Sequence, residues 1–149
     1  MQIAIGSDHA GFALKEDIVA YLKEIGHEPI DFGTTSNTST DYPVYAKKVA
    51  TEVAAGTYEL GILVCGTGAG ISIAANKING IRAVVCSEPL TARLAREHNN
   101  SNILAFGARV IGNEMAKMIV YEWLNAHFDG DRHAKRVNMI GDIEQEMCC

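Results

Sequence analysis

The sequence predicts an α/β fold in which helices cover both faces of a parallel sheet. Short apolar runs alternate along the chain with longer amphipathic segments, and the runs are rich in Val and Ile. Parallel strands that are buried on both faces have this composition, and right-handed crossovers join them through the intervening helices. The expected fold is therefore a doubly wound, Rossmann-like three-layer sandwich with a five-stranded parallel sheet.

The strands are expected at 3–5, 28–32, 60–65, 82–86 and 103–106. The first helix is expected between the first two strands, because apolar side chains recur at helical spacing from Leu14 to Ile25 and Gly26 provides a stop. The second begins at Asp41-Tyr42-Pro43, with proline in its first turn, and ends at Gly56. Further helices are expected at 70–77, 89–97, 114–126 and about 132–146, and the polar segment 34–40 is expected to be a surface loop.

Length and composition indicate one compact domain over 1–149. The chain has 149 residues, of which 48% are hydrophobic and 21% charged, which is sufficient for a real core. A net charge of −5 without any run of Lys or Arg argues against nucleic acid and anionic membranes as partners. The sequence has neither a signal-peptide pattern nor a membrane-spanning apolar stretch, so a cytoplasmic protein is expected. All four cysteines are expected to be thiols, with Cys86 in the core and Cys148 and Cys149 in a solvated tail.

The most informative segment is the glycine loop Cys65-Gly66-Thr67-Gly68-Ala69-Gly70, which follows an apolar strand and leads into a helix. Its glycines let backbone N–H groups converge on an anion, and the positive end of the helix assists them. A cysteine at this position is favoured as a thiolate and suits a base or nucleophile, although a small buried hydrophobe is the alternative. Ile71 and Ser72 do not fit a dinucleotide fingerprint, a P-loop or a cysteine phosphatase. The loop is predicted to bind an oxyanion or a phosphate.

Other candidate residues also follow predicted strands or end predicted helices. Asp8 and His9 follow the first strand and suit sugar hydroxyls or phosphate, and Asp8 equally suits a helix cap. His98 and Asn99 end a helix, where an acid–base role competes with simple stabilisation of the helix dipole.

Three arginines are candidates for binding a phosphate. Arg132 and Arg136 share a helix face and suit a phosphate clamp or a solvated basic face, and Arg109 follows the last strand. The five histidines are scattered without ligand spacing, so no metal is expected.

Four segments carry a family resemblance: GSDHAGF at 6–12, DYP at 41–43, CGTGAGISIAANK at 65–77 and REHNN at 96–100. Together they resemble the sugar-phosphate isomerase family that includes type B ribose-5-phosphate isomerases and galactose-6-phosphate isomerase subunits. The resemblance runs from Met1 to about Ile143. One branch of that family lacks the cysteine and uses a glutamate at the position of Ile71, so the thiolate chemistry is expected here.

The resemblance implies a cofactor-free aldose–ketose isomerase that interconverts ribose 5-phosphate and ribulose 5-phosphate through a cis-enediolate. Cys65 would move the proton between C1 and C2, the backbone of 66–70 would stabilise the enediolate, and Thr67 would assist the proton shuttle or hold a hydroxyl. His98 would open the furanose ring. The implied sugar contacts are Asp8, Tyr42 and Asn99, and the implied phosphate contacts are His9, Arg109, Arg132 and Arg136. The family is homodimeric, and each of its sites is built from both subunits.

Two other functions stay open on the residues alone. One is isomerisation of a six-carbon sugar phosphate such as allose or galactose 6-phosphate. The other is a phosphate- or nucleotide-binding module without chemistry on the same scaffold. Cys65 favours an enzyme, because a binding module needs the glycines of the loop but not the thiol.

Overall fold

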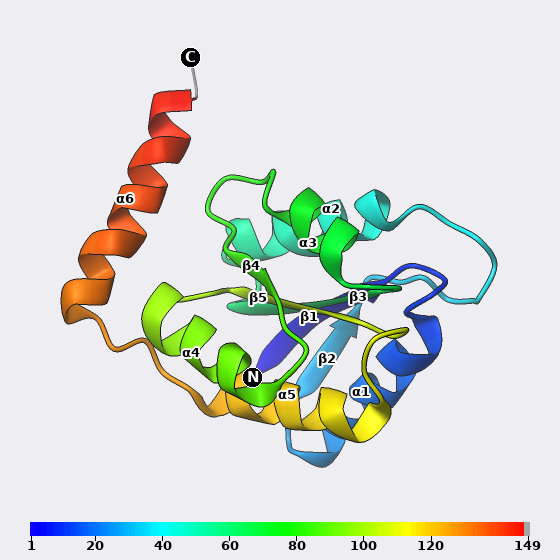
Figure 1. Ribbon diagram of the computed structural model, residues 1–149. Helices are drawn as coiled ribbons and strands as arrows, with labels where there is room; N and C mark the ends of the chain where they lie inside the picture. Colours follow the sequence, from blue (N-terminus) through cyan, green and yellow to red (C-terminus); the bar gives the residue numbers. More distant parts are fainter. Residues whose placement is uncertain (148–149) are drawn as a thin grey trace.

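The computed structural model describes residues 1–147, in which six helices surround a sheet of five parallel strands (Figure 1). Cys148 and Cys149, expected in a solvated tail, lie outside the described residues. The strands are β1 Gln2–Ser7, β2 Glu28–Asp31, β3 Leu60–Cys65, β4 Ala83–Val85 and β5 Ile103–Gly107. The helices are α1 Phe12–Glu24, α2 Tyr42–Ala54, α3 Ala69–Ala75, α4 Pro89–Asn99, α5 Asn113–Asn125 and α6 Asp131–Met147.

Five of the helices, α1 to α5, form two layers, one on each face of the sheet (Figure 1). One face is covered by α1, α4 and α5, whose apolar side chains pack on β1, β3 and β5 around Trp123 and Phe106. The other is covered by α2 and α3, which pack on the sheet around Val49 and Ile71. The predicted doubly wound three-layer sandwich is therefore confirmed.

The strand order is β2-β1-β3-β5-β4, with every pair parallel. From β1 the chain first moves to one edge of the sheet, and from β3 it moves to the other, so the direction of winding reverses between these two neighbours. Such a reversal leaves a crevice outside the carboxyl ends of the two strands, which is where ligands bind in open α/β sheets. The segments after Ser7 and Cys65 open into this crevice.

Burial of the edge strands differs from the prediction. All strands were expected to be buried, yet β2 and β4 are only partly covered, and Val85 is 46% exposed. They are the outer strands of the sheet, so each has a neighbour on one side only. β4 is also shorter than the expected 82–86, whereas α3 begins one residue before the expected start.

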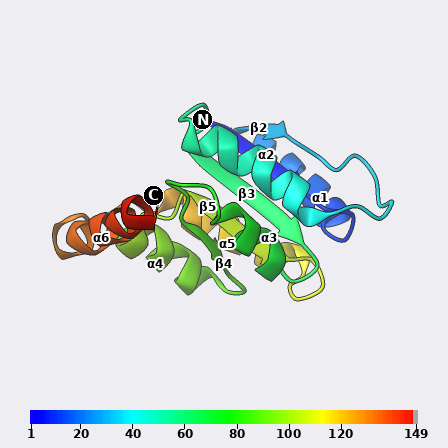
Figure 2. The ribbon, with the colours of Figure 1, turned by 90° about the horizontal axis from the view of Figure 1, so that it is seen from above.

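The last helix, α6, extends away from the sandwich beside α4 (Figures 1 and 2). Of its described side chains only His133 is buried, while Met139, Ile140 and Ile143 are exposed. A helix with so little covered surface gains little stability from its own chain. Within residues 1–147, no helix has both the length and the apolar character needed to cross a membrane.

Candidate active site

The glycine loop forms a tight turn around the thiol of Cys65. The Cys65 side chain is buried, at 4% exposure, and the backbone N–H of Gly68 donates a hydrogen bond to its Sγ at 3.1 Å. The backbone N–H of Ala69 donates to Oγ1 of Thr67 at 3.3 Å, and Thr67 itself is exposed. Helix α3 begins here, so its first N–H groups have no acceptor within the helix and face the crevice. An anion beside the thiol would meet these donors.

Gly68 is required by the loop on two grounds. Its φ of +81° lies in the left-handed region, which side chains rarely adopt. A Cβ at this position would also lie 2.8 Å from the backbone of Phe106 and 2.6 Å from the side chain of Val85. The loop can therefore turn back over Cys65 only with glycine at this position.

Gly70 and Gly66 bring two predicted ligand residues to the loop. A Cβ on Gly70 would lie 2.7 Å from the Tyr42 ring, so this ring, from the first turn of α2, rests directly on the loop. A Cβ on Gly66 would lie 3.2 Å from Nη1 of Arg109, whose backbone N–H donates to the Gly66 carbonyl at 3.0 Å. The guanidinium and the phenol thus lie against the glycine loop, one at Gly66 and the other at Gly70.

Asp8 and His9 follow β1 and reach the same crevice. The backbone N–H of Asp8 donates to the carbonyl of Val64, the residue before Cys65, at 3.3 Å. The buried Asp8 carboxylate accepts a hydrogen bond from the N–H of Gly11 at 3.1 Å and thereby holds the turn before α1. The helix itself begins after Gly11, without a side-chain cap, so Asp8 closes this turn instead of capping the helix as predicted. Nδ1 of His9 lies 3.2 Å from both the backbone N–H and the carbonyl oxygen of Thr40, so the backbone of the 34–40 loop holds the ring through this nitrogen. Nε2 is the ring nitrogen that these contacts leave for a ligand.

A second cluster of predicted residues forms between α4 and α6. The rings of His98 and His133 are stacked, with centroids 4.2 Å apart and planes 4° from parallel. Burial lowers the pKa of His133, and the positive charges of His98, Arg132 and Arg136 lower it further. The two arginines thus lie within electrostatic reach of the stacked pair, and Asn99 is adjacent to it in the chain. His133 was missed in the sequence, where its only signal is its place between Arg132 and Arg136.

The same cluster holds the one group of possible metal ligands that the described residues contain. Side-chain donor atoms of His98, Asp129 and His133 all lie within 4.8 Å of one another, although the sequence shows no ligand spacing. In parallel stacked rings the nitrogen lone pairs point along parallel planes rather than to one point. We therefore interpret the group as a ring contact beside a carboxylate.

The carboxyl end of α4 is held by a buried arginine. Nη1 of Arg96 donates to the Ser101 carbonyl at 2.7 Å and to Oδ1 of Asn100 at 3.3 Å. Asn100 ends the helix in the left-handed conformation, with φ of 46°. Arg96 also lies over the Trp123 ring at 5.7 Å, and burial lowers its pKa. This buried arginine therefore holds the end of α4 that carries His98.

Cys86, the other cysteine of residues 1–147, is a free thiol in the core, as predicted, and burial raises its pKa to about 11.

The cluster around Cys65 and the cluster around His98 lie at opposite ends of the strands. Cys65 is the last residue of β3, at the carboxyl end of the strands, whereas His98 lies in the last turn of α4, shortly before β5 begins at Ile103, at the amino end of the strands. Ile103 pairs with Gly61, and Gly107 pairs with Cys65, so the full length of these paired strands separates the two clusters. At a rise of about 3.3 Å per residue this is roughly 13–16 Å. One chain therefore carries both predicted groups without bringing them together.

This combination of fold, glycine loop and thiol matches one class of enzymes. Residues 3–140 match the model of the family described as Ribose/Galactose Isomerase, so the chain belongs to this family and is an isomerase. It is 61% identical over 144 residues to ribose-5-phosphate isomerase B of Escherichia coli, covering 97% of each chain. It is also 42% identical over 147 residues to a D-erythrulose-4-phosphate isomerase of Pectobacterium atrosepticum, covering 98% of this chain and 97% of the relative.

A solved structure agrees with the whole fold. The ribose-5-phosphate isomerase B of Clostridium thermocellum superposes with a TM-score of 0.97 at 55% identity, covering 98% of this chain and 99% of that one. The family resemblance drawn from the four sequence segments is thereby confirmed.

Proposed function

We propose that this enzyme interconverts ribose 5-phosphate and ribulose 5-phosphate through a cis-enediolate, with Cys65 as the base. The observation that carries the proposal is the buried thiol at the carboxyl end of β3, which accepts a hydrogen bond from Gly68 at the start of α3. A hydrogen bond to sulfur stabilises the thiolate more than the thiol. The similarity to the Escherichia coli ribose-5-phosphate isomerase B supports the pentose substrate.

The proton transfer needs few groups. The Cys65 thiolate removes the proton from C2 of the open-chain aldose, and the electron pair moves into a C1–C2 double bond with negative charge on O1. Backbone N–H groups of 66–70 stabilise this charge, and Thr67 assists the movement of a proton between O1 and O2. The thiol then returns its proton to C1, which gives the ketose and regenerates the thiolate.

Substrate binding is assigned to the residues that flank the thiol. The imidazole of His9 and the guanidinium of Arg109 bind the phosphate, and Asp8 and Tyr42 position the hydroxyls. The contact of the His9 ring with the backbone of Thr40 and the contact of Tyr42 with Gly70 support these roles. Charge-assisted bonds of this kind hold phosphate firmly without a metal.

His98, Asn99, Arg132 and Arg136 are assigned to the site of a second subunit. His98 opens the furanose ring by proton transfer, Asn99 binds a sugar hydroxyl, and the two arginines complete the phosphate site. Their position at the amino end of the strands supports this arrangement, because Cys65 of the same chain lies at the carboxyl end. The exposed apolar residues of α6 also support it, since a partner would cover them. We propose a cytoplasmic homodimer with two composite sites.

A four-carbon sugar phosphate is a second candidate substrate, favoured by one specific observation. The relative named D-erythrulose-4-phosphate isomerase is 42% identical, so closely related chains act on sugars of different length. Six-carbon sugar phosphates such as allose or galactose 6-phosphate are the other alternative, given the name of the family. A non-catalytic binding module is not favoured, because binding a phosphate or nucleotide requires the glycines of the loop but not the thiol of Cys65.

The test is a panel of four-, five- and six-carbon aldose phosphates, incubated with the purified protein after exhaustive chelation and dialysis. We expect the highest kcat/KM on ribose 5-phosphate, without added metal or nucleotide. Preference for another chain length would change the substrate, and activity that returns only with a metal would contradict the mechanism.

A further inference from the structure

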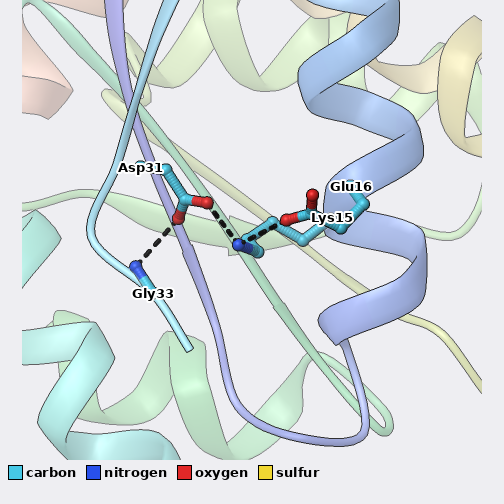
Figure 3. A network of polar contacts seen from close by, with 4 residues as sticks. All are labelled: Lys15, Glu16, Asp31 and Gly33. Atoms are coloured by element: carbon cyan, nitrogen blue, oxygen red, sulfur yellow. Dashed lines mark hydrogen bonds and ion pairs between the residues drawn. The ribbon is translucent and has the colours of Figure 1, made fainter. Parts of the chain in front are cut away.

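Lys15 is a lysine whose side chain is wholly buried. It lies in α1 with 0% exposure, and its ammonium contacts the carboxylates of Asp31, at the end of β2, and Glu16 (Figure 3). A fully buried lysine is rare, because removing its charge from water is energetically costly. Replacing such a pair by apolar residues is often neutral or stabilising. Its stability contribution alone therefore does not account for the pair.

The ammonium holds one oxygen of Asp31 and leaves the other for the backbone. Oδ2 of Asp31 contacts Lys15, while Oδ1 accepts a hydrogen bond from the N–H of Gly33 at 2.8 Å (Figure 3). Gly33 has a φ of +96°, so the chain makes a sharp turn directly after β2. The ion pair thus fixes the position of this turn relative to α1.

The turn at Gly33 is hydrogen-bonded to the end of β1. The N–H of Ser7 donates to the Gly33 carbonyl at 2.5 Å, and the N–H of Thr34 donates to the Ser7 carbonyl at 2.6 Å. Asp8 and His9, the proposed sugar and phosphate ligands, follow Ser7 directly. A continuous set of contacts therefore runs from the Lys15 ammonium through Asp31 and Gly33 to the substrate-binding segment.

We propose that Lys15 is a positioning residue for substrate binding, acting through Asp31 and Gly33 on Asp8 and His9. The inference rests on the proposed function, since it takes Asp8 and His9 as substrate ligands. The Lys15 side chain is wholly buried, so it is out of reach of a substrate in the crevice. Cys65 is held by a separate hydrogen bond from Gly68. The contacts that run from Lys15 through Asp31 and Gly33, here called the relay, therefore affect substrate binding and KM but leave the proton transfer unchanged.

The test uses three variants and a control. Lys15→Met keeps the length of the side chain without its charge, Asp31→Ala removes the acceptor for Gly33, and a third variant carries both changes. Lys23→Met is the control, because Lys23 is an exposed lysine on the same helix. Each test variant is expected to raise KM for ribose 5-phosphate about 5–10-fold with kcat within about twofold, while Lys23→Met stays at the wild-type KM.

Two further readouts separate positioning from loss of fold. Because both residues act through one relay, the double variant should raise KM about as much as either single variant, not by their product. Amide exchange at Ser7 should become faster in Lys15→Met and in Asp31→Ala. If Lys15→Met fails to fold, Asp31→Ala alone decides the matter, since its side chain is already 34% exposed and Glu16 still pairs with Lys15.

The outcomes are distinct from those of the proposed function. A wild type that isomerises none of the sugar phosphates would overturn the proposed function. A wild type that isomerises ribose 5-phosphate, with variants whose KM stays within twofold, would overturn the positioning role alone. Multiplicative effects in the double variant, or failure of both single variants to fold, would also overturn it, because the pair would then be a general stability element.

Discussion

The backbone N–H of Gly68 donates a hydrogen bond to Sγ of Cys65 at 3.1 Å, three residues after the thiol. This bond exists because Gly68 adopts a φ of +81°, which turns the chain back over the sulfur as α3 begins. The thiol is thereby fixed at the end of β3 with a donor aimed at it. The conformation of one glycine thus controls the position of the proposed base.

We expect Gly68→Ala to reduce kcat at least about tenfold, because a Cβ here meets the backbone of Phe106 and must displace the loop. Gly80→Ala is the matched control, since Gly80 has a φ of +83° with nothing within 4 Å of its Cβ position. Both variants carry the left-handed penalty of about 1–2 kcal/mol. Thermal unfolding and kinetics measure the two effects; equal loss of kcat in both variants would contradict the role of the loop geometry.

Arg132→Ala and Arg136→Ala should each raise KM by ~10-fold or more, because a charge-assisted hydrogen bond to phosphate contributes roughly 1.5–3 kcal/mol. Lys135→Ala is the control, as an exposed cation between them on the same helix. Steady-state kinetics with ribose 5-phosphate provides the measurement. If all three variants have the same KM, the arginines are only a solvated basic face.

His98→Ala should impair ribose 5-phosphate much more than erythrose 4-phosphate. The phosphate of the four-carbon sugar occupies the oxygen that would close a furanose ring, so this substrate needs no ring opening. Ring opening is a separate proton transfer for which a general acid–base group contributes ~10²–10⁴-fold. The comparison requires kcat/KM on both sugars for wild type and variant, and equal losses would remove the ring-opening role.

Mixing two inactive variants tests whether the site is composite. If Cys65 and His98 of different subunits share a site, a heterodimer of Cys65→Ala and His98→Ala contains one intact site and one doubly altered site. Random exchange makes about half of the dimers heterodimers, so about a quarter of wild-type activity should return. The assay follows activity after the two proteins are unfolded and refolded together. No recovery despite heterodimer formation would place both groups in one subunit's site.

The sequence was sufficient for the features that depend on nearby residues. The alternation of apolar runs predicted every strand and helix, and the spacing of the glycines predicted the loop around Cys65. Asp8 could be recognised as an acceptor for a nearby N–H because it bonds Gly11, only three residues away, although this bond closes the turn before α1 and does not cap the helix. Such local contacts follow from backbone geometry, which the sequence pattern reflects directly.

Contacts between distant segments could not be predicted. The stacking of His98 on His133 depends on how α6 returns to α4, and the pairing of Lys15 with Asp31 depends on the packing of α1 beside β2. The helical spacing places Lys15 on the same face as Ile18 and Leu22, but a lysine gives no sign in the sequence of being buried there. The exposure of β2 and β4 likewise depends on strand order, which periodicity does not reveal.

The central claim is that Cys65 is the base, and Cys65→Ala tests it most directly. The variant should fold and bind sugar phosphate, because other residues make the binding contacts, while kcat falls ~10²–10⁴-fold. Cys65→Ser should rescue little, since a hydroxyl is far harder to deprotonate than a thiol. The decisive measurement is the exchange of the C2 hydrogen of ribose 5-phosphate with solvent deuterium, which follows proton removal even when net conversion is slow. We predict that Cys65→Ala loses this exchange in proportion to kcat; exchange at the wild-type rate would show that another residue is the base.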